Sequence, residues 1–142
     1  MTDENGINKS TFYNNERVCL NLECEIIKID PLLVIGLGLY NSEGVNIFWS
    51  INLESAEPIQ LRLGFQKIQM LIPSNFLNHG KYSIELIVAL HNSKWIYRPH
   101  DNAPVLYFSL IDQLPTNSVW SDKRQGCLVS NVEYKKIDNW EQ

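Results

Sequence analysis

Hydrophobic and polar residues alternate with a period of two along several segments of this chain. Between Tyr82 and His91 one set of alternate positions is wholly apolar (Tyr, Ile, Leu, Val, Leu), and the other set is mixed. Between Val18 and Ile26 apolar residues alternate with Cys, Asn and Glu. Successive side chains of a strand point to opposite faces, so both segments are predicted to be strands with one face in a core. The predicted core residues are Leu20, Leu22, Ile84, Leu86 and Val88.

Further strand-like segments recur along the chain at intervals of about 8–12 residues. They cover residues 32–40, 45–51, 61–72 and 105–111, and residues 127–137 have a weaker pattern of the same kind. Turn-forming Asn, Gly and Pro residues separate them, and no segment has a helical period. Seven or eight short strands with this spacing predict an all-β fold, an antiparallel β-sandwich.

The chain is expected to hold one domain. Residues 1–14 are polar and have no period, so they are predicted to be a tail or linker. Residues 15–142 are predicted to form a single β-sandwich. A domain of this size buries enough surface to be stable without a disulfide or a structural metal.

The charge and the cysteines narrow the possible partners and the compartment. The net charge of -4 argues against nucleic acid, because binding phosphates requires a basic face. No apolar run approaches the roughly 18 residues of a membrane span, so direct membrane insertion is not expected. Cys19 and Cys24 are five positions apart and would point to opposite faces of one strand. We therefore expect these two and Cys127 to be reduced and the compartment to be cytoplasmic.

Motifs for catalysis and for cofactor binding are absent from the sequence. It has no Walker phosphate loop, no dinucleotide glycine motif and no G-x-S-x-G elbow. The three histidines, His79, His91 and His100, do not stand at metal-ligand spacing with one another or with a cysteine. The sequence therefore predicts neither an enzyme, nor a cofactor, nor a metal site.

Aromatic residues near the predicted strand ends offer a different kind of chemistry. Residues 95–100, WIYRPH, combine two rings with a guanidinium and an imidazole. Rings that cover the C–H face of a sugar beside donors for its hydroxyls are typical of carbohydrate sites, although single tryptophans more often cap a core. Trp49 joins this group only if Phe48 faces the core, and the opposite parity is equally open. The predicted carbohydrate-binding residues are Trp49, His91, Trp95, Tyr97 and Arg98.

Three segments resemble a known family. They are Gly80-Lys81-Tyr82 after Phe76-Leu77, the strand–turn–strand segment 37–51, and the tail 118–128, whose Arg-x-Gly-x-Leu motif is the most specific element. Their order and spacing are similar to the Wzt-type C-terminal carbohydrate-binding domain of ATP-binding-cassette exporters of lipopolysaccharide O antigen. The resemblance covers about residues 16–136.

The resemblance implies an immunoglobulin-like sandwich that binds the exported polysaccharide on a sheet face. It also implies a homodimer that exchanges its C-terminal strand, and partners in a separate nucleotide-binding domain that hydrolyses ATP and in a membrane subunit. The weak pattern of residues 125–136, after a long loop, independently favours pairing with a second copy. Two positions depart from the family: Tyr134 stands where tryptophan is usual, and Trp49 where a small residue is common.

Two other functions stay open at this point. One is a dimerisation or adaptor sandwich whose sheet face binds a protein, and the other is an accessory domain of a glycan-modifying enzyme such as a methyltransferase. A glycan site should combine exposed rings with hydrogen-bonding side chains, whereas a protein site should present a flatter apolar patch with a polar rim. The chain could be part of a transporter ATPase subunit, a stand-alone protein or such an accessory domain.

Overall fold

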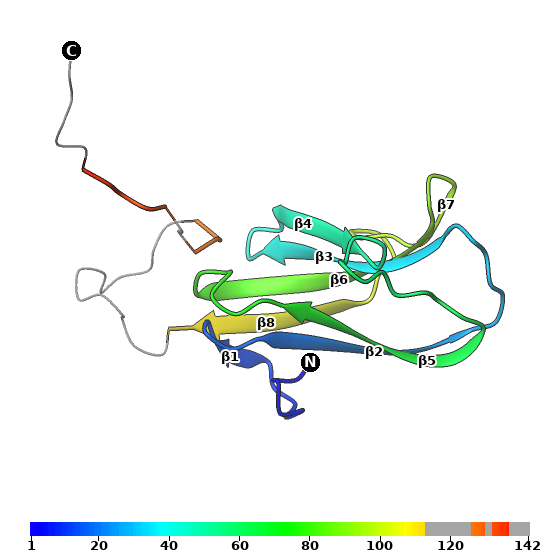
Figure 1. The fold of residues 1–142 in the computed structure, drawn as a ribbon, viewed down its shortest axis with the longest axis horizontal. Coiled ribbons are helices and arrows are strands. Elements are labelled where there is room, and N and C mark those ends of the chain that lie inside the picture. Colours follow the sequence, from blue (N-terminus) through cyan, green and yellow to red (C-terminus); the bar gives the residue numbers. More distant parts are fainter. Residues whose placement is uncertain (113–125, 130–131, 137–142) are drawn as a thin grey trace, which may run out of the picture.

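The computed structural model describes residues 1–112, 126–129 and 132–136. These residues form strands and no helix, which confirms the predicted all-β sandwich of seven or eight strands. One sheet has the order β1-β8-β6-β3-β4 with β7 paired to the end of β6, and the other pairs β2 with β5 (Figure 1). The strands are β1 (Thr11–Tyr13), β2 (Val18–Ile26), β3 (Leu33–Asn41), β4 (Asn46–Ile51), β5 (Gly64–Ile72), β6 (Gly80–Leu90), β7 (Lys94–Tyr97) and β8 (Val105–Ile111).

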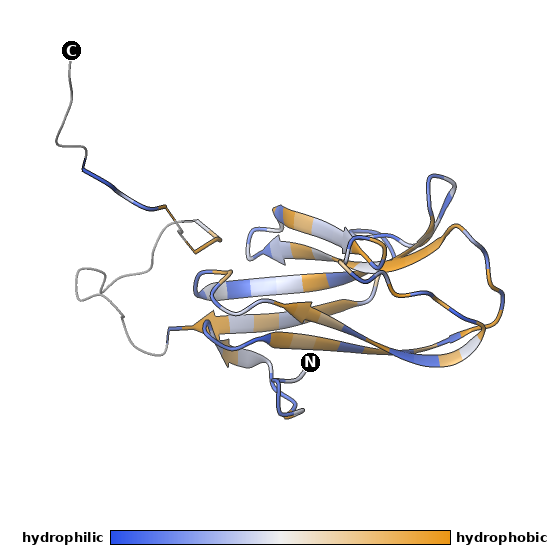
Figure 2. Ribbon diagram, in the orientation of Figure 1, coloured by the Kyte–Doolittle hydropathy of each residue, from blue (hydrophilic) through white to orange (hydrophobic). Residues whose placement is uncertain are grey.

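The two sheets enclose an apolar core. Hydrophobic residues recur along the long strands (Figure 2), and the antiparallel registers bring their inward-facing members together. In the β3–β6 pair, for example, Leu37 lies opposite Leu86 and Leu39 opposite Ile84. Among the strand pairs of the described residues, β1 and β8 alone are parallel. The buried cluster consists of Phe12, Val18, Leu20, Leu37, Leu39, Ile72, Leu77, Tyr82, Ile84, Phe108 and Leu110.

Two of the five predicted core residues are fully buried, Leu20 and Ile84. Leu22, Leu86 and Val88 are only half-buried. The reason is that a two-stranded sheet covers part of a six-stranded one. Leu22 and Leu86 line an apolar cleft of about 100 Å³ between β2, β5, β6 and β8.

The first 14 residues belong to the sandwich, in contrast to the tail predicted from their polar composition. They include β1, which pairs with β8 and buries Phe12 completely. The backbones of Thr2 and Cys19 exchange two hydrogen bonds of 2.9 Å, so the N-terminus extends the sheet edge at β2. A three-residue strand with one apolar side chain is too short to show a period, which is why the pattern missed it.

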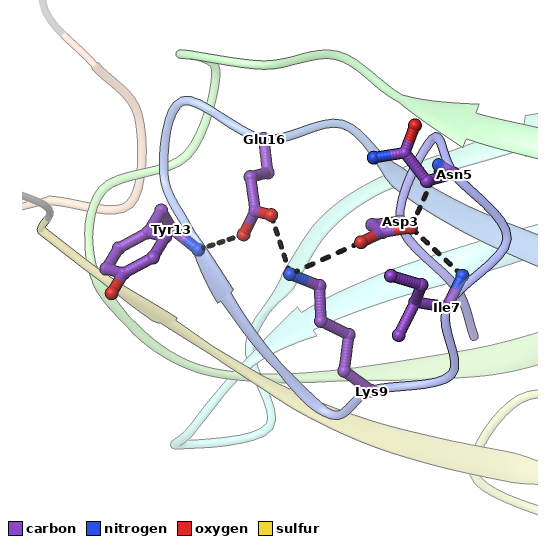
Figure 3. A network of polar contacts seen from close by, with 6 residues as sticks. All are labelled: Asp3, Asn5, Ile7, Lys9, Tyr13 and Glu16. Carbon is purple, nitrogen blue, oxygen red and sulfur yellow. Dashed lines mark hydrogen bonds and ion pairs between the residues drawn. The ribbon is translucent and has the colours of Figure 1, made fainter.

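A polar network holds this N-terminal segment in place (Figure 3). Lys9 Nζ lies 2.6 Å from Glu16 Oε1 and 3.6 Å from Asp3 Oδ2. Asp3 Oδ1 accepts the backbone N–H groups of Ile7 and Asn5. The hydrogen bond from Ile7 is the main reason that the pKa of Asp3 is lowered, while the Lys9–Glu16 contact lowers the pKa of Glu16 and raises that of Lys9.

Residues 126–129 of the C-terminal tail lie against the β5–β6 loop. Asn78 donates its side-chain amide to the carbonyls of Gly126 and Leu128, both at 2.9 Å. The Tyr82 hydroxyl donates to the Asn78 carbonyl at 2.7 Å, and burial raises the pKa of Tyr82 to about 12. The family-like motif is thus anchored at its Gly-x-Leu end, whereas its arginine, Arg124, lies outside the described residues.

The strand predicted over residues 127–137 is not formed within the described chain. Residues 126–129 and 132–136 contain a single β-bridge, between Leu77 and Leu128. Val132 is 66% exposed and Tyr134 is 92% exposed, and residues 132–136 lie away from the strands (Figure 1). An isolated chain gives this segment no partner strand, so strand exchange with a second copy stays a prediction.

Candidate functional site

The outward side of the large sheet holds an unusual set of residues. The β3–β6 register places Gly38 opposite Glu85, and the β3–β4 register places the same glycine opposite Trp49. We call this side the outer face, because Leu37 and Leu39, on either side of Gly38, point into the core. In the sequence, β3 and β6 have apolar residues or glycine at positions that face both sides of the sheet. This pattern is typical of a sheet covered on both sides.

The structure resolves the parity of β4. Phe48 packs against the core cluster and Trp49 is on the outer face, where 49% of it is exposed. A Cβ atom at Gly38 would lie 2.9 Å from the Trp49 indole and from the Tyr40 ring. The indole therefore lies over a position that only glycine can occupy without displacing it.

Four rings form what we call the aromatic cluster: Tyr40, Trp49, Trp95 and His100. Trp49 Nε1 donates to the Tyr40 hydroxyl at 2.7 Å, and the Trp49 and Trp95 rings meet edge to face at 5.7 Å. The Tyr40 and His100 rings are 4.4 Å apart. Tyr40 is buried beneath the others, and this burial raises the pKa of its phenol. Trp49 and Trp95 keep exposed ring surface, 49% and 39%.

A buried carboxylate lies at the base of the cluster. Glu85 is only 6% exposed although it points to the outer face. Its Oε1 accepts the backbone N–H of His100 at 3.1 Å. Its Oε2 lies 3.2 Å from His100 Nδ1, close enough for an ion pair but not oriented as a hydrogen bond, so Oε2 accepts none from the described residues. A carboxylate this buried requires a compensating partner, and His100 is the group that supplies it.

The loop between β7 and β8 positions the polar groups above the rings. The side chain of Asn102 accepts the Arg98 backbone N–H at 2.8 Å and donates to the Ile96 carbonyl at 2.9 Å. His100 has a φ of +63°, a conformation in which histidine is tolerated better than most residues. The Arg98 guanidinium lies 5.7 Å from the centre of the Trp95 ring, within the range of a cation–π contact.

The structure brings together three of the five predicted site residues, Trp49, Trp95 and Arg98. His91 lies at the end of β6, where its backbone N–H donates to the Leu32 carbonyl, and no contact joins its side chain to the cluster within the described chain. Tyr97 is 41% exposed and lies opposite Val88, beyond an irregularity in the β6–β7 register. These two residues are therefore not part of the cluster.

Sequence reasoning missed Tyr40, Glu85 and His100. For Glu85 a signal was present, because a single glutamate alternates with Ile87 and Ala89 on a strand whose other parity is also apolar. A charge in a strand with two apolar faces points to a buried partner. That partner, His100, could not be identified without the three-dimensional path of the β7–β8 loop.

Within the described residues no three histidine, cysteine or acidic side chains are grouped in a way that could hold a metal ion. The same residues include no helix long and apolar enough to span a membrane.

Comparisons with known proteins give a match at the level of structure. No protein-family model matches the chain, and neither does any curated protein. A solved structure described as the "Crystal structure of the C-terminal domain of wzt" matches with a TM-score of 0.65, over 96% of this chain and 79% of that chain. The sequence identity is 12%, so the likeness shows a shared fold. The resemblance seen in the sequence is thus confirmed in the fold of the domain.

Proposed function

We propose that this chain is a non-catalytic carbohydrate-binding module whose outer face binds a polysaccharide at the aromatic cluster. The observation that carries the proposal is the pairing of two half-exposed indoles, Trp49 and Trp95, with polar groups fixed beside them, Arg98 and His100. The rings offer apolar surface to the C–H face of a sugar, and the polar groups offer hydrogen bonds to its substituents.

The expected affinity of one such site is modest. Each stacked ring should contribute on the order of 0.5–1.5 kcal/mol, by analogy with aromatic pairs. A chain of repeating sugars bound by two linked sites gains affinity by avidity, since the second site then binds an already tethered ligand. A homodimer would therefore suit a polymeric ligand better than a monomer.

The biological setting that we propose is export of an O-antigen-like polysaccharide by an ATP-binding-cassette transporter. The fold shared with the Wzt C-terminal domain and the family-like segments of the sequence support this setting. In it, the chain acts in the cytoplasm at the inner membrane, next to a nucleotide-binding domain and a membrane subunit. Three free cysteines agree with a reducing compartment.

The test of glycan binding is a calorimetric titration of the surface polysaccharide of the source organism into three proteins. Trp95→Ala should weaken binding about two- to tenfold, the equivalent of one stacked ring. Phe65→Ala is the matched control, because Phe65 is an 81% exposed ring on β5, in the other sheet. Equal binding by wild type and Trp95→Ala, both folded, would remove Trp95 from the site.

Strand exchange in the dimer is tested separately by light scattering. A chain ending at Asp122 lacks residues 125–136 and should be monomeric or unstable. A truncated chain that remains a stable dimer would place the interface elsewhere.

A second candidate function, binding of a protein partner, is favoured by an apolar group at one end of the β2–β5 sheet. Ile27, Leu63 and Phe65 are 84%, 62% and 81% exposed, and they lie close together because Ile26 pairs with Gly64. Under this alternative Phe65→Ala abolishes capture of a partner from the source organism, whereas Trp95→Ala has no effect. The same two variants therefore separate the two functions.

A further inference from the structure

The inference concerns the charge of the ligand, and it rests on the proposed function. Several cations of the described residues contact a carboxylate, for example Lys9 with Glu16, Arg17 with Glu4 and Lys67 with Glu23. Within the same residues no carboxylate contacts the Arg98 guanidinium, which lies over the half-exposed Trp95 ring. A guanidinium without a counterion beside a ligand-binding ring is available to an anion of the ligand.

The Arg98 guanidinium lies beside the exposed ring surface of the cluster. Its Cζ is 5.7 Å from the centre of the Trp95 ring, and the backbone N–H of Arg98 donates to Asn102. A cation–π contact leaves the N–H groups of a guanidinium available to a bidentate partner. A carboxylate or phosphate on a sugar stacked at Trp95 would meet that edge.

His100 supplies a second polar group with a defined direction. Its Nδ1 faces the Glu85 carboxylate, so Nε2, on the far side of the ring, points away from that carboxylate. The side chain is 59% exposed, whereas that of Glu85 is 8% exposed. Glu85 therefore does not meet the ligand; it is a positioning residue whose Oε1 accepts the backbone N–H of His100 and whose Oε2 faces the ring.

We propose that the glycan bound at the aromatic cluster is acidic, and that its carboxylate or phosphate group is recognised by Arg98, with Nε2 of His100, whose ring Glu85 positions, as a second polar contact. The site thus selects a sugar with an anionic substituent over its neutral counterpart. The protein carries a net charge of -4, so this preference comes from the local arrangement and not from overall attraction of anions.

The experiment compares matched sugars by NMR titration of the ¹⁵N-labelled protein. Glucose, galactose and mannose are each tested as the neutral hexose, the uronic acid and the 6-phosphate. At least one acidic form should bind about tenfold or more tightly than its neutral counterpart, the usual worth of a charged hydrogen bond. A preference for the uronic acid or for the 6-phosphate identifies whether a carboxylate or a phosphate is recognised.

Two variants test the residues. Arg98→Gln should remove the preference for the acidic form, because it weakens binding of the acidic sugar more than binding of the neutral sugar. Lys94→Gln is the matched control, because it removes the same charge one position before Trp95, on the opposite side of β7. Equal losses in the two variants would mean that net charge alone is sensed and would overturn the role of Arg98.

Glu85→Gln tests the positioning role through the His100 ring itself. The ¹⁵N shifts of Nδ1 and Nε2 should change in this variant, together with a loss of the acidic preference similar to that of His100→Gln. Unchanged ring shifts, or an intact preference in His100→Gln, would contradict the assignment. If neutral and acidic sugars bind equally to wild type, the inference fails and glycan binding stands; if none of the nine sugars and no polysaccharide binds, the proposed function fails with it.

Discussion

The outer faces of the two sheets differ in what their strands present to the surroundings. On the β2–β5 sheet the outward residues of the strand centres are polar and meet across the strands: Lys67 pairs with Glu23 at 3.1 Å and Gln69 donates to Asn21 at 2.9 Å. On the large sheet the corresponding positions of β3 and β6 hold glycines, aliphatic residues and the buried Glu85. The centre of the β2–β5 outer face is in contact with solvent. The outer face of the large sheet is instead covered by Trp49, Trp95 and the β7–β8 loop.

The difference shows which face is built for a ligand. A solvated face is stabilised by exposed pairs that contribute little, so its residues can change with small effect. The outer face of the large sheet contains two glycines, a buried carboxylate and rings in edge-to-face contact, each of which depends on its neighbours. Features that lower the stability of a fold while ordering exposed groups are typical of functional sites.

The largest effect on stability is expected from adding a side chain at Gly36, one of the two β3 glycines on the outer face. A Cβ atom at Gly36 would lie 1.8 Å from the Ser50 carbonyl oxygen, so Gly36→Ala must displace β4. We expect a loss of about 3 kcal/mol in the free energy of unfolding, measured by urea denaturation. Gly64→Ala on β5 is the control: nothing lies within 4 Å of its Cβ position, and only its φ of +95° opposes the change, at about 1–2 kcal/mol. A smaller loss of unfolding free energy in Gly36→Ala than in Gly64→Ala would contradict the close approach of β4 to Gly36.

A medium effect is expected from the hydroxyl beneath the indole. Tyr40→Phe removes the acceptor of Trp49 Nε1–H, at an expected cost of about 0.5–1.5 kcal/mol in the free energy of unfolding. The fluorescence maximum of the protein, to which Trp49 is one of four contributing tryptophans, should shift because this indole is no longer held. Tyr107→Phe, on a 72% exposed ring of β8, should change neither stability nor fluorescence. Identical fluorescence of Tyr40→Phe and wild type would show that the ring is fixed by other contacts.

The difference between the two faces can be predicted from the sequence only in part. The period of β2 predicts a strand with one solvated face, and that face is present. For β3 and β6 both parities are apolar, so the sequence predicts central strands but not what covers their outer side. Trp49 could not be assigned to a face, because β4 has apolar residues at both parities as well.

The polar half of the site depends on contacts between distant segments. Glu85 and His100 are fifteen positions apart, and the link between them is made by the backbone N–H and the ring of His100 in a left-handed conformation. No periodic pattern encodes such a contact. His91 was expected in the site because it follows β6 directly, but proximity in sequence did not bring it to the cluster.

A small, local effect is expected when acid reaches the N-terminal network next to β2. The pKa values of Asp3 and Glu16 are lowered in the folded state, so their contribution is present above the ordinary values of 3.8 and 4.5 and is lost as the pH falls through the folded values. The pKa of Lys9 is raised, so its contribution to stability is fully present below pH 10.5 and is lost as the pH rises through the folded value. The Ile7 amide, which donates to Asp3, should shift upfield in an NMR titration below about pH 4. In Lys9→Gln the shift should begin at higher pH.

The smallest effect is expected on the solvated face. Lys67 and Glu23 have side chains that are 83% and 73% exposed, and water replaces their contact easily. Lys67→Gln should change the free energy of unfolding by less than about 0.5 kcal/mol. A loss comparable to that of Tyr40→Phe would erase the distinction between the two faces.

The central claim is that the outer face of the large sheet binds glycan, and chemical-shift mapping tests it most directly. The surface polysaccharide of the source organism, cut to short oligosaccharides, is added to ¹⁵N-labelled protein. We predict shifts of the Trp49 and Trp95 indole N–H signals and of the Gly38 amide, with the Asn21 and Gln69 amides of the β2–β5 sheet unchanged. Shifts confined to β2 and β5, or no shifts with a protein shown to be folded, would contradict it.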